Sequence, residues 1–167
     1  IGGVILRLDD AAAVEAAAER LLEVGRTAGH AARGVLVQPM APPGVELIVG
    51  ARRDPQVGPL VVVGIGGILA EALDDVVVAL APIDAATAVA LLDRLRAVAL
   101  LDGFRGGPAA DRAAVGDLIA AVSRLISDDR EIIEIDLNPV IAHAGGSLAV
   151  DGLIVVEVAP ELDQGRR

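Results

Sequence analysis

The chain has 167 residues and a formal net charge of −10 at pH 7, and 54% of its residues are hydrophobic although it contains one Phe and neither Tyr nor Trp. This length allows one domain or two small lobes, whose core Val, Leu, Ile and Ala must fill. The acidic charge disfavours nonspecific binding to nucleic acids or anionic membranes, because both require basic patches. The absence of Cys excludes disulfides and thiolate metal sites. The absence of Lys excludes a lysine that holds a phosphate or forms a Schiff base.

No membrane span or secretory signal is visible in the sequence. The longest apolar run without a charge, residues 59–70, is too short and too rich in Gly to cross a bilayer. We therefore expect a cytoplasmic protein. Because Ile1 is not a natural first residue, we also expect that a segment precedes it in the native polypeptide.

The first part of the chain combines extended segments with one helix. Apolar residues predict a strand over 4–8, and Asp10 is positioned as the N-cap of a helix over about 11–24. A short strand over 35–37 then leads into a stiff, proline-rich connector at 38–44.

Three extended segments follow, and the strand over 35–37 together with the first two of them predicts an antiparallel meander. The first covers 45–51, and a turn at 52–55 connects it to the second at 60–63. The glycine-rich sequence 64–67 separates the second segment from the third, which covers 71–80.

Two helices come next. Asp84 is the N-cap of a helix that extends to about Ala97, and Asp111 opens a longer helix to about Ile126. The intervening residues 100–108 are rich in Gly and predict a loop.

The chain closes with a predicted hairpin. Apolar strands at 132–137 and 148–150 flank the turn Gly145-Gly146, and residues 160–167 have the composition of a tail. This order of strands and helices predicts an α+β or mixed α/β fold.

The hairpin places three oxygen-bearing side chains near one end, namely Asp136, Asn138 and Asp151. Hard cations such as Mg²⁺ take a few carboxylate and amide oxygens from the protein and the rest from water and phosphate. The cluster therefore predicts a metal site. The alternative from the residues alone is a plain hairpin in which Asn138-Pro139 makes a turn.

Two further groups of residues can be interpreted either as ligand contacts or as ordinary structural elements. Gly64-x-Gly66-Gly67 can cradle a phosphate with converging N–H groups, although a flexible turn is favoured for a lone motif. Gln38 and Glu46 flank the connector, where exposed backbone groups can pair with a purine edge and a carboxylate can accept from ribose hydroxyls. The alternative for Glu46 is a solvated side chain at a strand start.

The histidines and several arginines are weaker candidates. His30 and His143 have no second His or Cys at ligand spacing, so we interpret both as surface residues. Arg52, Arg53 and Arg105 can hold phosphate oxygens, but a surface role is favoured for each.

Seven short motifs occur along the chain in a fixed order. They are Val35-Leu-Val-Gln38-Pro-Met, Gly44-Val-Glu46-Leu-Ile-Val-Gly50, Arg53-Asp54-Pro55-Gln56-x-Gly58-Pro59, Gly64-x-Gly66-Gly67-Ile68, Leu80-Ala-Pro82, Leu100-Leu-Asp102-Gly103-x-Arg105-Gly106 and Glu134-x-Asp136-Leu-Asn138-Pro139. With this series the chain, from Gly2 to about Val156, resembles the ATP-grasp domain of ADP-forming (NDP-forming) acyl-CoA synthetases, which are related to the succinyl-CoA synthetase beta subunit.

The resemblance implies an ATP-grasp-like α+β fold, with antiparallel or mixed sheets, flanking helices and a truncated N-terminal part. It implies a partial ATP-grasp domain over 2–157. The small lobe would cover roughly 2–37 and the large lobe roughly 45–157, followed by a tail or linker at 158–167.

The resemblance also implies an activity. Such enzymes hold a nucleotide between two lobes, and a phosphohistidine on a separate CoA-binding domain or subunit carries the phosphoryl group between nucleotide and acyl phosphate. The implied cofactors are ATP or ADP and Mg²⁺. The implied partner is that phosphohistidine domain, with neither nucleic acid nor membrane, and the family allows an oligomer.

Ten residues match functional positions of the family. Those implied to contact the nucleotide are Gln38 and Ala41 at the adenine hinge, Glu46 at the ribose, Gly2 and Gly3 in the loop over the phosphates, and Gly66 and Gly67. Those implied to hold Mg²⁺ are Asn138 and Asp151, with Asp136 in place of a usual Glu.

Two departures from the family pattern limit what this chain does alone. The family's nucleotide-binding lysine lies upstream, and this chain contains no Lys and no phosphohistidine domain. We therefore expect the isolated chain to be inactive and to bind nucleotide weakly or not at all. An alternative is a regulatory or assembly module of a synthetase-like protein acetyltransferase.

Overall fold

The computed structural model describes residues 2–67 and 74–157. The chain divides into two compact units, Ile1–Ala41 and Pro42–Arg167, and each is described by itself.

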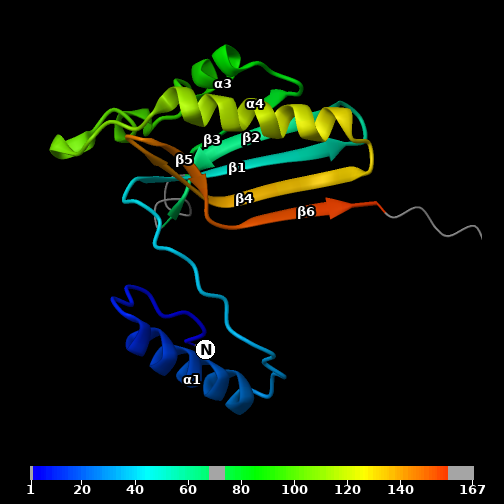
Figure 1. Cartoon of the computed structure of the whole chain (residues 1–167). Coiled ribbons are helices and arrows are strands. Elements are labelled where there is room, and N and C mark those ends of the chain that lie inside the picture. Colours follow the sequence, from blue (N-terminus) through cyan, green and yellow to red (C-terminus); the bar gives the residue numbers. More distant parts are fainter. Residues whose placement is uncertain (1, 68–73, 158–167) are drawn as a thin grey trace, which may run out of the picture. The chain divides into compact units, whose positions relative to one another are not determined.

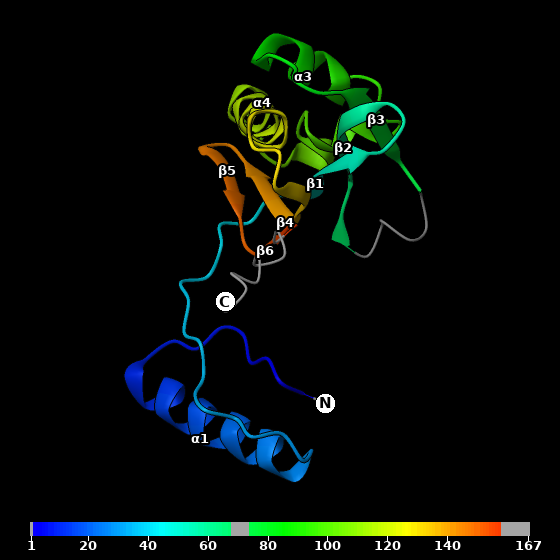
Figure 2. The same ribbon diagram turned by 90° about the vertical axis from the view of Figure 1, so that its right-hand side faces the viewer.

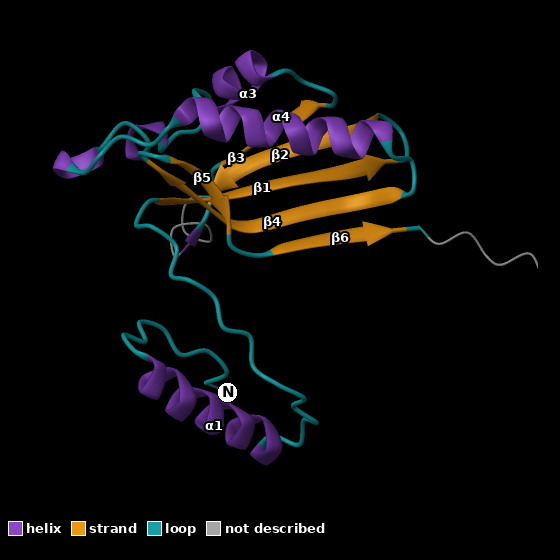
Figure 3. Ribbon diagram, in the orientation of Figure 1, coloured by secondary structure: helices purple, strands orange, loops and turns teal. Residues whose placement is uncertain are grey.

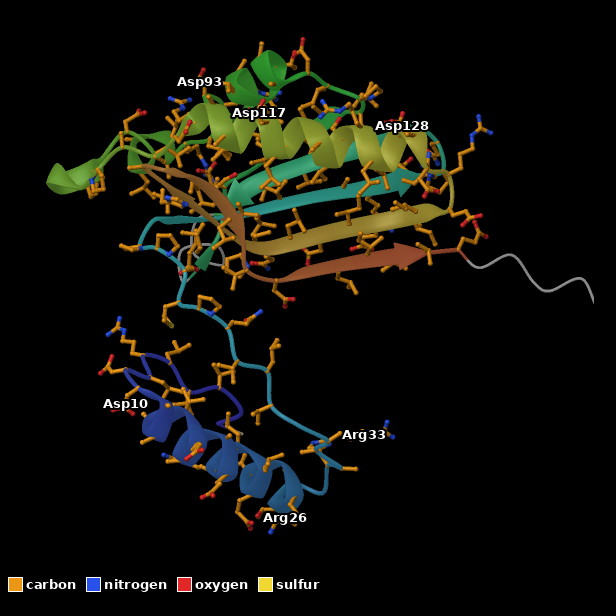
Figure 4. The ribbon with its side chains drawn as sticks, in the orientation of Figure 1. Asp10, Arg26, Arg33, Asp93, Asp117 and Asp128 are labelled. Carbon is orange, nitrogen blue, oxygen red and sulfur yellow. The ribbon has the colours of Figure 1, made fainter. Side chains whose placement is uncertain are left out.

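The first unit is built on helix α1, Ala11–Thr27 (Figure 1). Its N-cap is Asp10, whose carboxylate accepts the N–H of Ala13 at 2.7 Å, as the sequence predicted. The helix continues three residues beyond the predicted end. Figure 4 labels Asp10 at the start of the helix and Arg26 in its last turn, where a cation favours the helix dipole.

The predictions of strands over 4–8 and 35–37 are wrong. Neither segment forms a ladder in the described part of the chain. Apolar side chains from both segments instead pack on α1 around a small cavity of about 80 Å³. A strand needs a neighbouring backbone to satisfy its N–H and C=O groups, and the apolar pattern of a segment cannot supply that neighbour.

The second unit is one six-stranded sheet in which every pairing is antiparallel (Figures 1 and 3). The strand order is β3-β2-β1-β4-β5, and β6 also pairs with β4. The strands are β1 (Val45–Asp54), β2 (Gly58–Ile65), β3 (Val76–Leu80), β4 (Ile132–His143), β5 (Gly146–Ala149) and β6 (Gly152–Val156). The predicted α+β class is confirmed, and so is the antiparallel pairing of the segments at 45–51 and 60–63, but the predicted meander is wrong in including 35–37.

Helices α3 (Ala85–Leu92) and α4 (Arg112–Asp128) lie on the same side of the sheet (Figure 2). Their predicted N-caps are confirmed, because Asp84 accepts the N–H of Thr87 at 2.8 Å and Asp111 accepts that of Ala114 at 3.0 Å. Short 3-10 helices over Val98–Leu100 and Phe104–Gly106 connect α3 to α4. No helix in the described residues is both long and apolar enough to cross a membrane.

Alternate residues of the central strands form the core beneath these helices. Leu47 and Val49 of β1 and Val61 and Val63 of β2 are all 0% exposed, and they pack with side chains from α3 and α4. Because side chains alternate along a strand, the residues between them face the opposite side of the sheet.

The predicted turn at 52–55 begins three residues later than expected. The carboxylate of Asp54 accepts the N–H groups of Gln56 and Val57 at 2.8 and 3.0 Å, which closes the turn after the strand. Strand β1 therefore runs to Asp54. Strand β3 begins at Val76, and residues 71–73 of the predicted segment lie outside the described residues.

Strand β4 is twelve residues long and does not turn at Asn138-Pro139, so the interpretation of that dipeptide as a turn is wrong. On its β1 side, Val140 pairs with Leu47 and Leu137 with Val49, so two β4 residues oppose one β1 residue. This is a β-bulge, a place where a sheet tolerates proline. On its other side β4 pairs with β6 up to Leu137 and with β5 from Val140 onward.

Candidate functional site

The face of the sheet opposite the helices carries most of the predicted site residues of the second unit. Glu46, Ile48 and Arg52 alternate with the buried side chains of β1 and therefore point to this open face, where Gly50 occupies the position between Ile48 and Arg52. Cross-strand pairing adds further residues to the same face, namely Val62 and Gly64 of β2, Val76, Val78 and Leu80 of β3, and Asp136 of β4.

Glu46 and the Gly66-Gly67 turn are in direct contact. The N–H of Gly66 donates to the carbonyl oxygen of Glu46 at 2.8 Å. Gly67 has φ +64° and lies against the Glu46 side chain, where an added Cβ would be 2.5 Å from Oε2. The Glu46 carboxylate is exposed and has no hydrogen bond or ion pair within the described residues.

Asn138 and Asp151 lie across from each other where β4 changes its partner. Leu137 pairs with Gly152, and the N–H of Val150 donates to the carbonyl oxygen of Pro139 at 3.0 Å, which brackets the two residues. Both side chains are exposed. One oxygen of Asp151, Oδ1, accepts the N–H of Gly152 at 2.8 Å, which holds the carboxylate at the start of β6.

Asp136 extends this cluster along the same strand. It lies two residues before Asn138, is half-buried, and is paired with Gly50 of β1 and Leu153 of β6. Because side chains two apart share a face, Asp136 and Asn138 both face away from the helices.

The donor set suits a hard cation that keeps part of its own shell. Asp136 and Asp151 offer two carboxylates, and Asn138 offers one amide oxygen. Within residues 2–67 and 74–157 no group of three or more His, Cys, Asp or Glu could hold a metal, so a cation here would need further ligands from outside the protein. Mg²⁺ is characteristically bound in this way, through one or two carboxylates together with water and phosphate oxygens.

The two halves of the site lie along one strand. Gly50, opposite Asp136, is four residues from Glu46, or about 13 Å at 3.3 Å per residue. Asn138 lies in the bulge opposite Ile48, only two residues from Glu46, or about 7 Å along β1. The fold thus brings six predicted residues to one unit: Glu46, Gly66, Gly67, Asp136, Asn138 and Asp151.

The other four predicted residues belong to the first unit. Gly2 has φ +75°, and Gly2, Gly3 and Gln38 are exposed while Ala41 is half-buried. Their roles remain predictions.

Two of the arginine and histidine candidates, Arg53 and His143, make local structural contacts. Arg53 donates from Nε to the carbonyl oxygen of Ile132 at 3.3 Å, and from Nη2 to those of Asp129, at 3.0 Å, and Ile126. His143 accepts the N–H of Gly145 at its Nδ1, at 3.1 Å, within the predicted turn.

The remaining arginine and histidine candidates are His30, Arg52 and Arg105. His30 and Arg52 are exposed, and Arg52 lies on the open face opposite Glu134. The side chain of Arg105 lies outside the described residues. Sequence reasoning missed Gly50 and the exposed apolar row of β3 on the open face, and the period-2 alternation of these strands is the signal that identifies them.

Comparison with known proteins agrees with this architecture. The ATP-grasp domain model matches residues 1–156, and the chain belongs to that family. The chain is 41% identical over 157 residues to the ADP-forming acetate–CoA ligase I of Archaeoglobus fulgidus, and 42% identical over 162 residues to a trans-feruloyl-CoA synthase of an unknown prokaryotic organism. Each alignment covers 93% of this chain and 23% of the relative, so the chain spans about a quarter of their length.

A solved structure is similar over most of the chain. It is the dinucleotide-forming acetyl-coenzyme A synthetase 1 of Ca. Korarchaeum cryptofilum, with a TM-score of 0.82 and 38% identity over 93% of this chain and 68% of that one. That protein was solved with coenzyme A and Mg-AMPPCP, with its phosphohistidine segment pointing towards the nucleotide-binding site. The resemblance predicted from the sequence motifs is confirmed.

Proposed function

We propose that the chain is the nucleotide- and Mg²⁺-binding ATP-grasp portion of a larger ADP-forming acid–CoA ligase. The reaction interconverts acyl-CoA, ADP and phosphate with acid, CoA and ATP through a phosphohistidine on another domain. The observation that carries the proposal is the strand register, which puts Glu46 and Asp136 on the open face of one sheet and brings Asn138 and Asp151 across from each other where β4 changes its partner. The named relatives are CoA ligases or synthetases, which favours an enzyme over a regulatory module.

Each side chain has a role that follows from its chemistry. The exposed Glu46 carboxylate would accept hydrogen bonds from the ribose hydroxyls. The oxygens of Asp136, Asn138 and Asp151 would hold Mg²⁺, which supplies neutralisation of the phosphate charge when bound. Phosphoryl transfer depends mainly on such positioning and charge stabilisation, so a site of carboxylates without a protein nucleophile is sufficient on this side of the reaction.

The remaining parts of the proposal concern the first unit and the partner. Gln38 and Ala41 would contact adenine, and Gly2 and Gly3 would cover the phosphates. The partner would be a CoA-binding phosphohistidine domain or subunit. The phosphohistidine segment in the similar Korarchaeum protein supports that assignment. A cytoplasmic location, where ATP and CoA are available, is part of the same proposal.

The test uses the complete polypeptide that contains this chain, with ATP, Mg²⁺, CoA and a panel of short acids. Asn138→Ala and Asp151→Ala should each lower kcat/KM by at least about 100-fold, since loss of a supporting metal contact alone commonly lowers activity by 10–100-fold. The Mg²⁺ concentration for half-maximal rate should rise in both. Formation of ADP and acyl-CoA is the readout.

The matched control is Asp117→Ala, an exposed carboxylate on the helical side of the sheet (Figure 4). It should leave both the rate and the Mg²⁺ dependence unchanged. Unaltered turnover in the Asn138 and Asp151 variants would reject the metal assignment. A wild-type protein that forms no acyl-CoA or ADP with any acid would reject the enzyme.

A further inference from the structure

Among the described glycines with positive φ, an added Cβ would lie within 3 Å of another atom at Gly67 and at Gly103; at Gly103 that atom is the backbone oxygen of Gly107, whereas at Gly67 it belongs to a side-chain carboxylate. Gly2, Gly29, Gly58 and Gly106 also have positive φ, but an added Cβ would meet nothing within 4 Å at any of them. At Gly67 (φ +64°) an added Cβ would lie 2.5 Å from Oε2 and 3.1 Å from Cδ of Glu46. The absence of a side chain at Gly67 therefore makes space for one particular carboxylate.

The turn and Glu46 are fixed to each other at the main chain as well. The N–H of Gly66 donates to the Glu46 carbonyl oxygen at 2.8 Å. Gly66 is buried, and an added Cβ there would lie 3.1 Å from the carbonyl carbon of Leu47. This hydrogen bond and the close approach of Gly66 to β1 hold the backbone of the turn beside Glu46, so that Gly67 lies next to the Glu46 side chain.

The Glu46 carboxylate has few other constraints. It is exposed, and no hydrogen bond or ion pair within the described residues holds it. A free Glu side chain samples many rotamers, and ordering it on ligand binding lowers affinity. The Gly66-Gly67 turn removes part of that freedom by occupying one side of the space around the carboxylate.

We propose that Gly67 is a positioning residue that fixes the orientation of the Glu46 carboxylate and so determines selectivity for the ribose hydroxyls of the nucleotide. The inference rests on the proposed function, in which Glu46 accepts from those hydroxyls. It assigns the glycine turn to ribose recognition rather than to cradling a phosphate.

The experiment compares Mg-ADP with Mg-2′,3′-dideoxy-ADP by calorimetric titration of the complete polypeptide. The wild type should bind ADP about tenfold or more tightly than the dideoxy analogue, as expected for hydrogen bonds to a charged acceptor. Gly67→Ala should displace the carboxylate, weaken ADP by about the same factor and leave the dideoxy analogue unchanged. Glu46→Ala should remove the same selectivity, and the double variant should add nothing further.

The matched control is Gly58→Ala. Gly58 has φ +90°, so the substitution imposes similar backbone strain, but nothing lies within 4 Å of the added Cβ. Its selectivity should equal that of the wild type. If Gly67→Ala is unstable, Gly67→Asn introduces the same Cβ in a residue that adopts positive φ more readily, and it should also remove selectivity.

Three outcomes are distinguishable. If the glycine variants weaken both nucleotides equally, the turn acts on the phosphates or on the fold and the inference is overturned. If the wild type binds both nucleotides equally, the ribose role of Glu46 is rejected and the inference with it. If the wild type binds neither, it is the proposed nucleotide-binding function that is rejected.

Discussion

Asp75 is the one buried carboxylate among the residues that the structure describes, with 4% of its surface exposed. It lies just before β3, and its two oxygens accept the backbone N–H groups of Arg96 at 2.9 Å and Ala97 at 2.8 Å. Burial, the largest single influence, raises the pKa of Asp75. The two N–H bonds and the charge of Arg96 together outweigh it, and the pKa falls below its ordinary value of 3.8.

We predict that Asp75→Asn lowers the free energy of unfolding by about 1–3 kcal/mol at pH 7, because an amide can accept only one of the two buried N–H groups without opposing the other. Urea unfolding followed by circular dichroism measures the change. Asp117→Asn, on the exposed face of α4, is the control and should change stability by less than about 0.5 kcal/mol.

The same carboxylate predicts the sign of a pH effect. Since its folded pKa lies below the unfolded value of 3.8, its stabilisation is fully present above that pH and is lost as the pH falls through the folded pKa. The stability difference between wild type and Asp75→Asn should therefore shrink below pH 3.8. A difference that grows on acidification would contradict the assignment.

At the scale of secondary-structure elements, the hydrogen bonds of Arg53 connect β1, α4 and β4. Arg53 leaves the end of β1 and donates to carbonyl oxygens in the last turn of α4, just after that helix, and in the first residue of β4. The carbonyl groups of Ile126 and Asp129 are of the kind that a helix C-terminus leaves without intrahelical partners. The planar guanidinium can reach several acceptors at once, which an ammonium cannot do in the same geometry.

We predict that Arg53→Lys lowers the free energy of unfolding by about 1–2 kcal/mol, since at least one carbonyl contact is lost. The neighbouring Arg52→Lys provides the matched control, because Arg52 is exposed on the other face of the same strand. Urea unfolding of both variants should separate them. Equal stabilities would show that the Arg53 contacts contribute nothing.

The sequence predicts those elements whose causes are local. Asp10, Asp84 and Asp111 cap helices because a side-chain oxygen and an N–H three residues later suffice. The segments 4–8 and 35–37 could not be judged in this way, because a strand depends on a partner elsewhere. The bulge at Asn138-Pro139 was missed for the same reason, since it exists only relative to β1.

At the scale of the whole molecule, the candidate site also combines features that can be predicted from local sequence with features that depend on distant strand pairing. The motif order predicted Glu46, Asn138 and Asp151 as site residues, and the strand pairing puts Asn138, on the strand next to that of Glu46, across from Asp151. The contact between Gly67 and Glu46 could not be read from the sequence, because Gly67 follows β2, Glu46 lies on β1, and only the register between these strands brings the two residues together.

The chain spans 23% of the length of its named ligase relatives and contains no lysine. We therefore predict that the isolated chain binds Mg-ADP at least about tenfold more weakly than the complete polypeptide, since a cationic phosphate contact contributes roughly 1.5–3 kcal/mol. Calorimetric titration of both proteins measures the difference. Equal affinities would mean that these 167 residues contain every important nucleotide contact.

The position of the bulge in β4 has a consequence for how the site assembles during folding. Asn138 and Asp151 are thirteen residues apart and meet through the β4–β5–β6 meander, a contact of low sequence separation that closes quickly. Glu46 joins them only when β1 docks on β4 across some ninety residues, and a slip of one residue in that pairing would turn its carboxylate towards the helices. The proposed metal-binding half is thus encoded locally, whereas the proposed ribose-binding half depends on the most distant pairing of the sheet.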